Sequence, residues 1–107
     1  MSDFGAMRDL DLVHLSREMM VWSKETFGCG IRTEPTLKHI EMEVQEVRDS
    51  KGEDPYEWID IIILALDGAL NAGFTPEEIA FFLRNKFEKN KNRAYKKNDD
   101  GVFLHVK

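Results

Sequence analysis

Several features that would anchor a protein or stabilise it covalently are scarce in this sequence. Cys29 is the single cysteine among 107 residues, which excludes an internal disulfide and suits a reducing compartment. The longest apolar run is Ile61–Leu66, far shorter than the ~20 residues that a membrane span needs. The first residues are polar and acidic, unlike a secretory signal. We therefore expect a cytoplasmic protein with no membrane partner.

Basic residues are also in the minority. Lysine and arginine number 15 against 20 aspartates and glutamates, for a net charge of -5. This balance argues against a nucleic-acid partner, because such binding needs a basic surface that displaces counterions. Seven of the 15 cations lie between Arg84 and Lys97, where Glu88 is the only acid. Most of them fit a solvated basic end of a helix. The separation of basic from acidic residues along the chain also suits a protein that binds an anion through these cations.

Two nucleotide- and metal-binding signatures are missing. There is no Gly-x-x-x-x-Gly-Lys loop, so the chain is not a P-loop enzyme. There is no Glu-x-x-His pair either, which weighs against a ferritin-like di-iron bundle. At this length we expect one domain over residues 1–107. A chain this short buries only roughly 60–65% of its unfolded surface, so we expect a homo-oligomer, a dimer or tetramer.

The apolar periodicity is helical along most of the chain. It predicts an all-α fold, a four-helix bundle, with helices near residues 9–26, 35–49 and 55–72 and a fourth that begins at Pro76. The third and fourth helices have clear starts: Asp54 and Thr75 are N-cap residues, each followed by proline. The third helix is apolar on nearly every side and should be central. Residues 102–106 are expected to be an irregular or β-like tail.

Four carboxylates in two pairs are the strongest chemical signal. Glu43 with Glu46, and Glu57 with Asp60, have i, i+3 spacing, so each pair lies on one helix face. Taken singly, Glu57 fits a capping box with Asp54, and the first pair fits a solvated helix face. Taken together, antiparallel packing of consecutive helices brings the pairs close. Four convergent acids need a partner, and a hard cation such as Mg²⁺ is a common one.

Further polar residues extend this pattern. Asp67 and Asn71 continue a polar stripe along the apolar third helix, and Lys86, Asn90 and Arg93 continue the inward stripe of the fourth. Acids that bind Mg²⁺ beside such cations suit cleavage of a phosphate ester or anhydride. One of the glutamates, with Glu46 favoured over Glu43, would be the general base. Trp22, Phe27 or Trp58 is a candidate to stack on a base, and the sequence does not distinguish them.

The ordered motifs resemble a known family, the MazG-like all-α nucleotide pyrophosphohydrolases, and within it the dATP/dGTP (MazZ-like) branch. The resemblance covers about Trp22 to Tyr95 and rests on these segments: Thr26-Phe-Gly-x-Gly-x-Arg-Thr33, His39-Ile-x-x-Glu-x-x-Glu46, Glu57-Trp-Ile-Asp60, Ile63-Leu-Ala-Leu-Asp-Gly-Ala69, Ala72-Gly-x-x-Pro-Glu-Glu-Ile79, Lys86 and Asn90-x-x-Arg93. Two positions depart from the pattern. The wider family has a glutamate where this chain has Met42, and the branch often has Trp-Pro where this chain has Ala94-Tyr95.

The resemblance implies a single MazG-like domain that hydrolyses a purine (d)NTP, most of all dGTP or dATP, to the monophosphate and pyrophosphate. It assigns Mg²⁺ or Mn²⁺ to Glu43, Glu46, Glu57 and Asp60, and implies an oligomer with sites between subunits. We expect substrate contacts from Lys86, Asn90, Arg93, Arg32, Asp67 and Asn71. The branch includes phage proteins that adjust nucleotide pools, which would place the protein in the host cytoplasm. The alternatives are a pyrimidine or damaged-nucleotide pyrophosphohydrolase and a non-catalytic acidic interaction module.

Overall fold

The computed structural model describes residues 11–106 and confirms the predicted all-α architecture. Its elements, in chain order, are four helices and a two-stranded antiparallel sheet: α1 (Leu12–Phe27), α2 (Thr33–Asp49), α3 (Pro55–Asn71), α4 (Pro76–Lys91), β1 (Tyr95–Lys97) and β2 (Phe103–His105). None of the described helices is long and apolar enough to cross a membrane.

Local capping explains where the helices begin. Asp11 caps α1 by accepting a hydrogen bond from the His14 backbone N–H; the predicted start at residue 9 lies outside the described residues. α2 begins at Thr33, two residues before the predicted start, because proline is tolerated in the first turn, where no intrahelical N–H bond is needed. The starts of α3 and α4 are as predicted, with Asp54 and Thr75 as N-caps.

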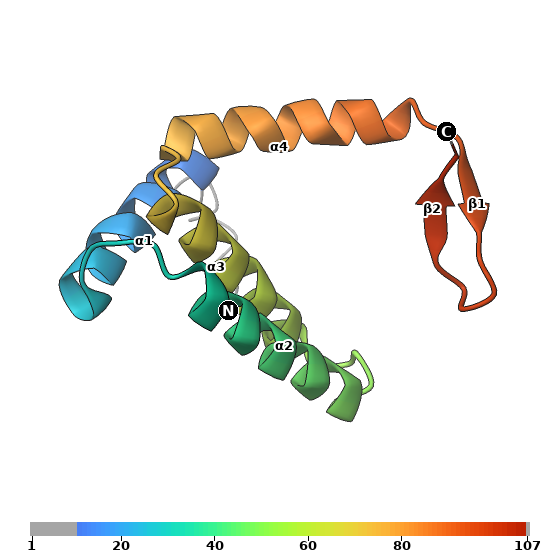
Figure 1. The fold of residues 1–107 in the computed structure, drawn as a ribbon, viewed down its shortest axis with the longest axis horizontal. Coiled ribbons are helices and arrows are strands. Elements are labelled where there is room, and N and C mark those ends of the chain that lie inside the picture. Colours follow the sequence, from blue (N-terminus) through green and yellow to red (C-terminus); the bar gives the residue numbers. More distant parts are fainter. Residues whose placement is uncertain (1–10, 107) are drawn as a thin grey trace, which may run out of the picture.

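α2 and α3 lie side by side along most of their length (Figure 1). Gly68 permits a close approach, because a Cβ atom at this position would lie 3.3 Å from the Thr36 Cγ2 atom. The connector between the helices is held by the Trp58 indole, whose Nε1 donates to the Gly52 carbonyl at 3.1 Å. The short connector and the close packing fix the register of the two helices, and thus of the acids they carry.

α4 extends away from the α2–α3 pair and carries the β1–β2 hairpin at its far end (Figure 1). Its first turn is tied to α1 by an ion pair between Arg17 and Glu77. In the hairpin, Tyr95 pairs with His105 and Lys97 with Phe103, so the expected C-terminal β-like tail is the second strand of a hairpin. The radius of gyration is 16.2 Å, against about 13 Å for a compact domain of this size.

The chain buries little apolar surface on its own. Leu70, 4% exposed, is the one buried hydrophobic core residue among residues 11–106. The helix predicted to be central, α3, leaves Ile59, Ile62 and Ile63 more than two-fifths exposed. The prediction of a central α3 is therefore not met within one chain, because α1 and α2 cover only part of its surface.

Candidate metal centre and adjoining cleft

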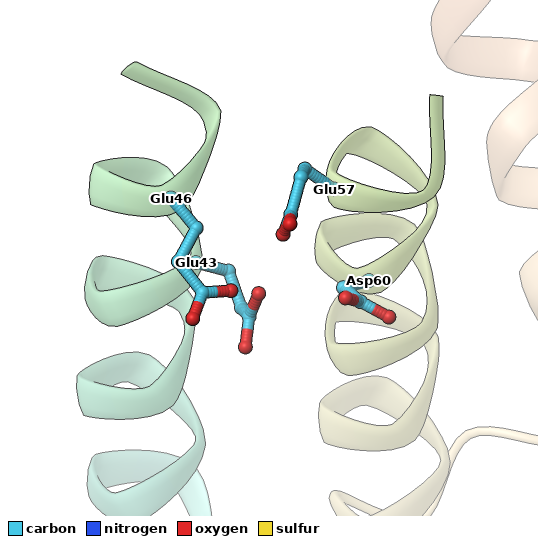
Figure 2. Close-up of side chains that lie close together, drawn as sticks. All are labelled: Glu43, Glu46, Glu57 and Asp60. Carbon is cyan, nitrogen blue, oxygen red and sulfur yellow. The ribbon is translucent and has the colours of Figure 1, made fainter. Parts of the chain in front are cut away.

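The four predicted acids converge at the seam between α2 and α3. Oxygen atoms of Glu43, Glu46, Glu57 and Asp60 all lie within 4.8 Å of one another. Figure 2 shows the two pairs on the facing sides of neighbouring helices, with the glutamate carboxylates directed into the space between them. The i, i+3 spacing within each helix and the short connector between the helices together produce this cluster.

Comparison of two helix starts shows that Glu57 is not serving as a cap. In α4 the capping box is complete, since the Glu78 carboxylate accepts from the Thr75 backbone N–H at 2.9 Å. In α3, Asp54 accepts from the Tyr56 N–H, but among the described hydrogen bonds none joins the Glu57 carboxylate to Asp54. The Glu57 side chain points instead toward the other acids (Figure 2). The simpler structural explanation for this residue therefore does not hold.

Two of the acids are poorly solvated. Glu43 is only 9% exposed, and its Oε2 atom and that of Glu57 are buried without a hydrogen-bond partner. A hydrogen bond with Glu46, then burial, raises the pKa of Glu43 above its ordinary value. Burial, followed by a hydrogen bond with Glu46, raises the pKa of Glu57. Unsatisfied buried carboxylate oxygens are costly, and a cation bound among them would remove that cost.

Among the described ion pairs and close N–O contacts, one involves an acid of the cluster. The His39 Nε2 atom lies 3.3 Å from a Glu43 oxygen, four residues along α2. The predicted phosphate ligands are elsewhere: Lys86 and Asn90 lie on the outer half of α4, and Arg93 follows it, with its Nη1 atom 3.5 Å from the Asn90 side-chain oxygen. Among the described ion pairs none joins these cations to the acids. A single chain thus holds the acids and the predicted phosphate-binding residues apart.

A cleft of about 540 Å³ adjoins the cluster on the side of His39. Its walls are mostly apolar and come from α1, α2 and α3, including Met19, Trp22, Phe27, Ile63 and Leu64. Trp22 and Phe27 are therefore the aromatic side chains that line a cavity, whereas Trp58 contacts the connector.

Arg32 and Asp67, both predicted substrate ligands, meet in this cleft. The Arg32 Nη2 atom donates to Asp67 Oδ2 at 3.2 Å and to Ser23 Oγ at 3.1 Å. The guanidinium carbon also lies 5.4 Å from the centre of the Phe27 ring. Asn71 does not line the cleft; its amide donates to the Asp67 carbonyl.

Ser23 was not anticipated from the sequence. The only sequence signal for Ser23 is its position seven residues after Ser16, which places both serines on the same face of α1. Both serines are almost fully buried in the structure.

An all-α chain with four convergent carboxylates beside an apolar cleft belongs to the class of carboxylate metal-binding helical proteins. The chain belongs to the dATP/dGTP pyrophosphohydrolase family, whose model matches residues 15–107. No curated protein sequence matches significantly. Among solved structures, the chain is similar to the cyanophage S-2L MazG-like pyrophosphohydrolase bound to dGDP and three catalytic Mn²⁺ ions per active site, with 27% identity and a TM-score of 0.72. The match covers 91% of this chain and 98% of the phage protein.

Proposed function

We propose that this protein hydrolyses purine deoxynucleoside triphosphates, dATP and dGTP, to the monophosphate and pyrophosphate. The observation that carries the proposal is the cluster of four carboxylates within 4.8 Å in a chain of the dATP/dGTP pyrophosphohydrolase family. The MazG-like neighbour, which binds dGDP and Mn²⁺, supports the same substrate class. We place the activity in the cytoplasm, in that of the host if a phage encodes the chain.

The cluster suits Mg²⁺ or Mn²⁺. Both cations prefer oxygen ligands, and Glu43 and Glu57 each offer a buried oxygen that has no other partner. Glu43, Glu46, Glu57 and Asp60 would hold the cation. When bound, it would neutralise charge on the phosphates and polarise their oxygens.

Glu46 is our candidate for the general base. It is exposed, so its carboxylate is open to solvent. One of its oxygen atoms also lies within 4.8 Å of an oxygen atom of each of the other three acids. Glu46 would accept a proton from the water that attacks the α-phosphorus, with pyrophosphate as the leaving group.

A homo-oligomer explains the exposed apolar surface. Soluble monomers rarely expose large contiguous apolar patches. Here α4 alone leaves Phe81, Leu83 and Phe87 more than half exposed, and α3 leaves Ile59 and Ile62, which do not line the cleft, exposed. An isolated two-stranded hairpin is also only marginally stable in water, and the apolar residues of β2 are exposed. A second copy packed on these surfaces would supply the core that one chain lacks.

The same assembly would complete the site. Lys86, Asn90 and Arg93 lie on the projecting arm formed by α4 and the hairpin, away from the acids of their own chain (Figure 1). In an oligomer the arm of one copy would reach the acids of another and place cations on the leaving pyrophosphate. Each active site would then combine acids from one subunit with phosphate ligands from its neighbour.

The function is tested by incubating the protein with the eight common NTPs and dNTPs and Mg²⁺ or Mn²⁺. We expect monophosphate and pyrophosphate, formed fastest from dGTP or dATP. Asp60→Asn should reduce turnover by at least about 100-fold, whereas Glu41→Gln, an exposed acid on α2 outside the cluster, should not. Preference for a pyrimidine or damaged nucleotide would favour the alternative substrate class. A folded, metal-insensitive protein without turnover would favour a non-catalytic module.

Complementation tests the shared site. Asp60→Asn and Arg93→Ala proteins, each of low activity, are unfolded together and refolded as a mixture. If the acids and Arg93 of one site come from different subunits, random pairing restores about a quarter of wild-type activity. If both come from the same subunit, every site carries a defect and the mixture stays inactive.

A further inference from the structure

We propose that the cleft beside the acids holds the purine base of the substrate, and that Arg32 and Asp67 together bind its polar edge. This inference rests on the proposed function. It adds the orientation of the nucleotide and a structural basis for the choice of base.

The walls of the cleft suit a flat heterocycle. Six of the eleven lining residues are apolar, two of them aromatic (Trp22 and Phe27), and polar groups that include Arg32 and Asp67 sit among them, a combination typical of small-molecule sites. A phosphate group would be a poor occupant, because it would lose its hydration against apolar walls and meet the Asp67 carboxylate. The two ends of a nucleotide therefore suit different parts of the site: the phosphates suit the four acids with a bound metal, and the base suits the cleft.

The distance between the two sites matches one nucleoside. Asp60 and Asp67 are seven residues apart on α3, which places them on nearly the same face and about 10 Å apart along the axis. The intervening Ile63 and Leu64 line the cleft. On α2, His39 lines the cleft and also contacts Glu43 of the cluster. The same surface of the α2–α3 pair therefore runs from the acids into the cleft without interruption.

Arg32 and Asp67 offer a donor and an acceptor side by side. Their side chains are 25% and 18% exposed, and the bond between them involves only Asp67 Oδ2. A carboxylate has lone pairs for about four hydrogen bonds, and in the described part of the chain Oδ1 accepts none. Ser23 and the Gly28 carbonyl accept from the guanidinium and hold it in place.

This pair complements both purines. With guanine, Asp67 accepts from N1–H and from the exocyclic N2 amine, while Arg32 donates to O6. With adenine, Asp67 accepts from the N6 amine and Arg32 donates to N1. Guanine makes one more contact to the carboxylate than adenine. A pyrimidine has the matching groups on a smaller ring, which would not reach as deep into the cleft when its phosphates are at the acids.

The decisive comparison is between dGTP and dITP, which differ only by the N2 amine. We expect the wild-type kcat/KM to be at least about fivefold higher for dGTP, the lower end of the discrimination provided by a bidentate pair. In Asp67→Asn the dGTP:dITP ratio should approach one, since the amide forms a weaker contact. Each ratio is measured on a single protein preparation, so it is independent of the folded fraction. Equal rates in wild type, or a ratio unchanged in Asp67→Asn, would overturn the proposal.

A measurement of nucleotide binding, made without hydrolysis, tests the base-binding cleft separately from the proposed reaction. In a Trp58→Phe protein, Trp22 is the remaining tryptophan, and it lines the cleft. Titration with dGMP should quench its fluorescence saturably, with weaker affinity for dIMP and loss of that difference in Asp67→Asn. Saturable, N2-dependent quenching, together with a wild-type protein that does not hydrolyse dGTP, would support the cleft and refute the reaction. Hydrolysis of dGTP without any quenching would refute the cleft and leave the reaction.

Discussion

Replacing Glu57 by glutamine should change stability in opposite directions with and without metal. In the metal-free protein, Glu57 is a poorly solvated carboxylate with an unpartnered buried oxygen, beside Glu46 and Glu43. Glutamine removes a negative charge from this cluster, so the metal-free variant should unfold at a higher temperature than wild type. In the proposed metal site the same carboxylate is a ligand, and its loss should weaken metal binding.

The stabilisation that bound metal adds to the native state can be calculated. A ligand at a hundred times its Kd stabilises the native state by about 2.7 kcal/mol, which raises Tm by roughly 10 °C in a domain of this size. If losing the ligand weakens binding about 10- to 100-fold, the stabilisation at the same metal concentration falls to about 0.4–1.4 kcal/mol. The Tm increase that Mn²⁺ produces should therefore shrink by half or more.

Thermal unfolding followed by circular dichroism, with EDTA and then with Mn²⁺, measures both effects. Glu53→Gln is the matched control, because Glu53 is an exposed acid in the α2–α3 connector and outside the cluster. Its Tm should respond to Mn²⁺ as wild type does. A lower metal-free Tm for Glu57→Gln would contradict the expected relief of charge repulsion, and equal stabilisation of variant and wild type by Mn²⁺ would exclude Glu57 as a ligand.

The pH dependence of the cluster, the close packing of α2 on α3 and the exposed face of α4 can each be tested. The pKa values of Glu43 and Glu57 are raised from 4.5 in the folded protein. Above pH 4.5 the folded metal-free protein therefore binds more protons than the unfolded chain. Its Tm should fall as pH rises from 4.5 through the raised values, and saturating Mn²⁺ should flatten that slope. Gly68→Ala gains about 0.5–1 kcal/mol of helix propensity but places a Cβ atom 3.3 Å from the Thr36 methyl; the substitution should therefore be less favourable in wild type than in a Thr36→Ser protein, as measured by denaturant unfolding. Phe87→Asp, on the exposed face of α4, should lower the mass measured by sedimentation, whereas an unchanged mass would remove α4 from the subunit interface.

Local rules were enough to predict much of the site from the sequence. The N-caps of α3 and α4 are determined by residues within one turn, and the i, i+3 spacing determines which acids share a face. A short connector then leaves antiparallel packing as the simplest arrangement. The convergence of Glu43 with Asp60 required no further information, and the structure confirms it.

The remaining features depend on contacts distant in sequence or outside the chain. Arg32 meets Asp67 across 35 residues, a pairing that no periodicity reveals. The apolar stripe on α4 predicts that this face is covered, but not whether the same chain or another copy covers it. The sequence therefore did not predict that α4 and the hairpin project from the other helices. β1 also escaped prediction, because two of its three residues are lysines, which are depleted in strands and common in basic helix ends.

In the proposed reaction, water attacks the α-phosphorus of a purine deoxynucleotide at the four-acid cluster. Hydrolysis of dGTP in ¹⁸O-labelled water with Mn²⁺, followed by mass spectrometry of the products, tests it most directly. We predict one ¹⁸O atom in dGMP, none in pyrophosphate, and at least about 100-fold slower labelling by Asp60→Asn. Label in pyrophosphate or in orthophosphate would place the attack at another phosphorus and contradict the account.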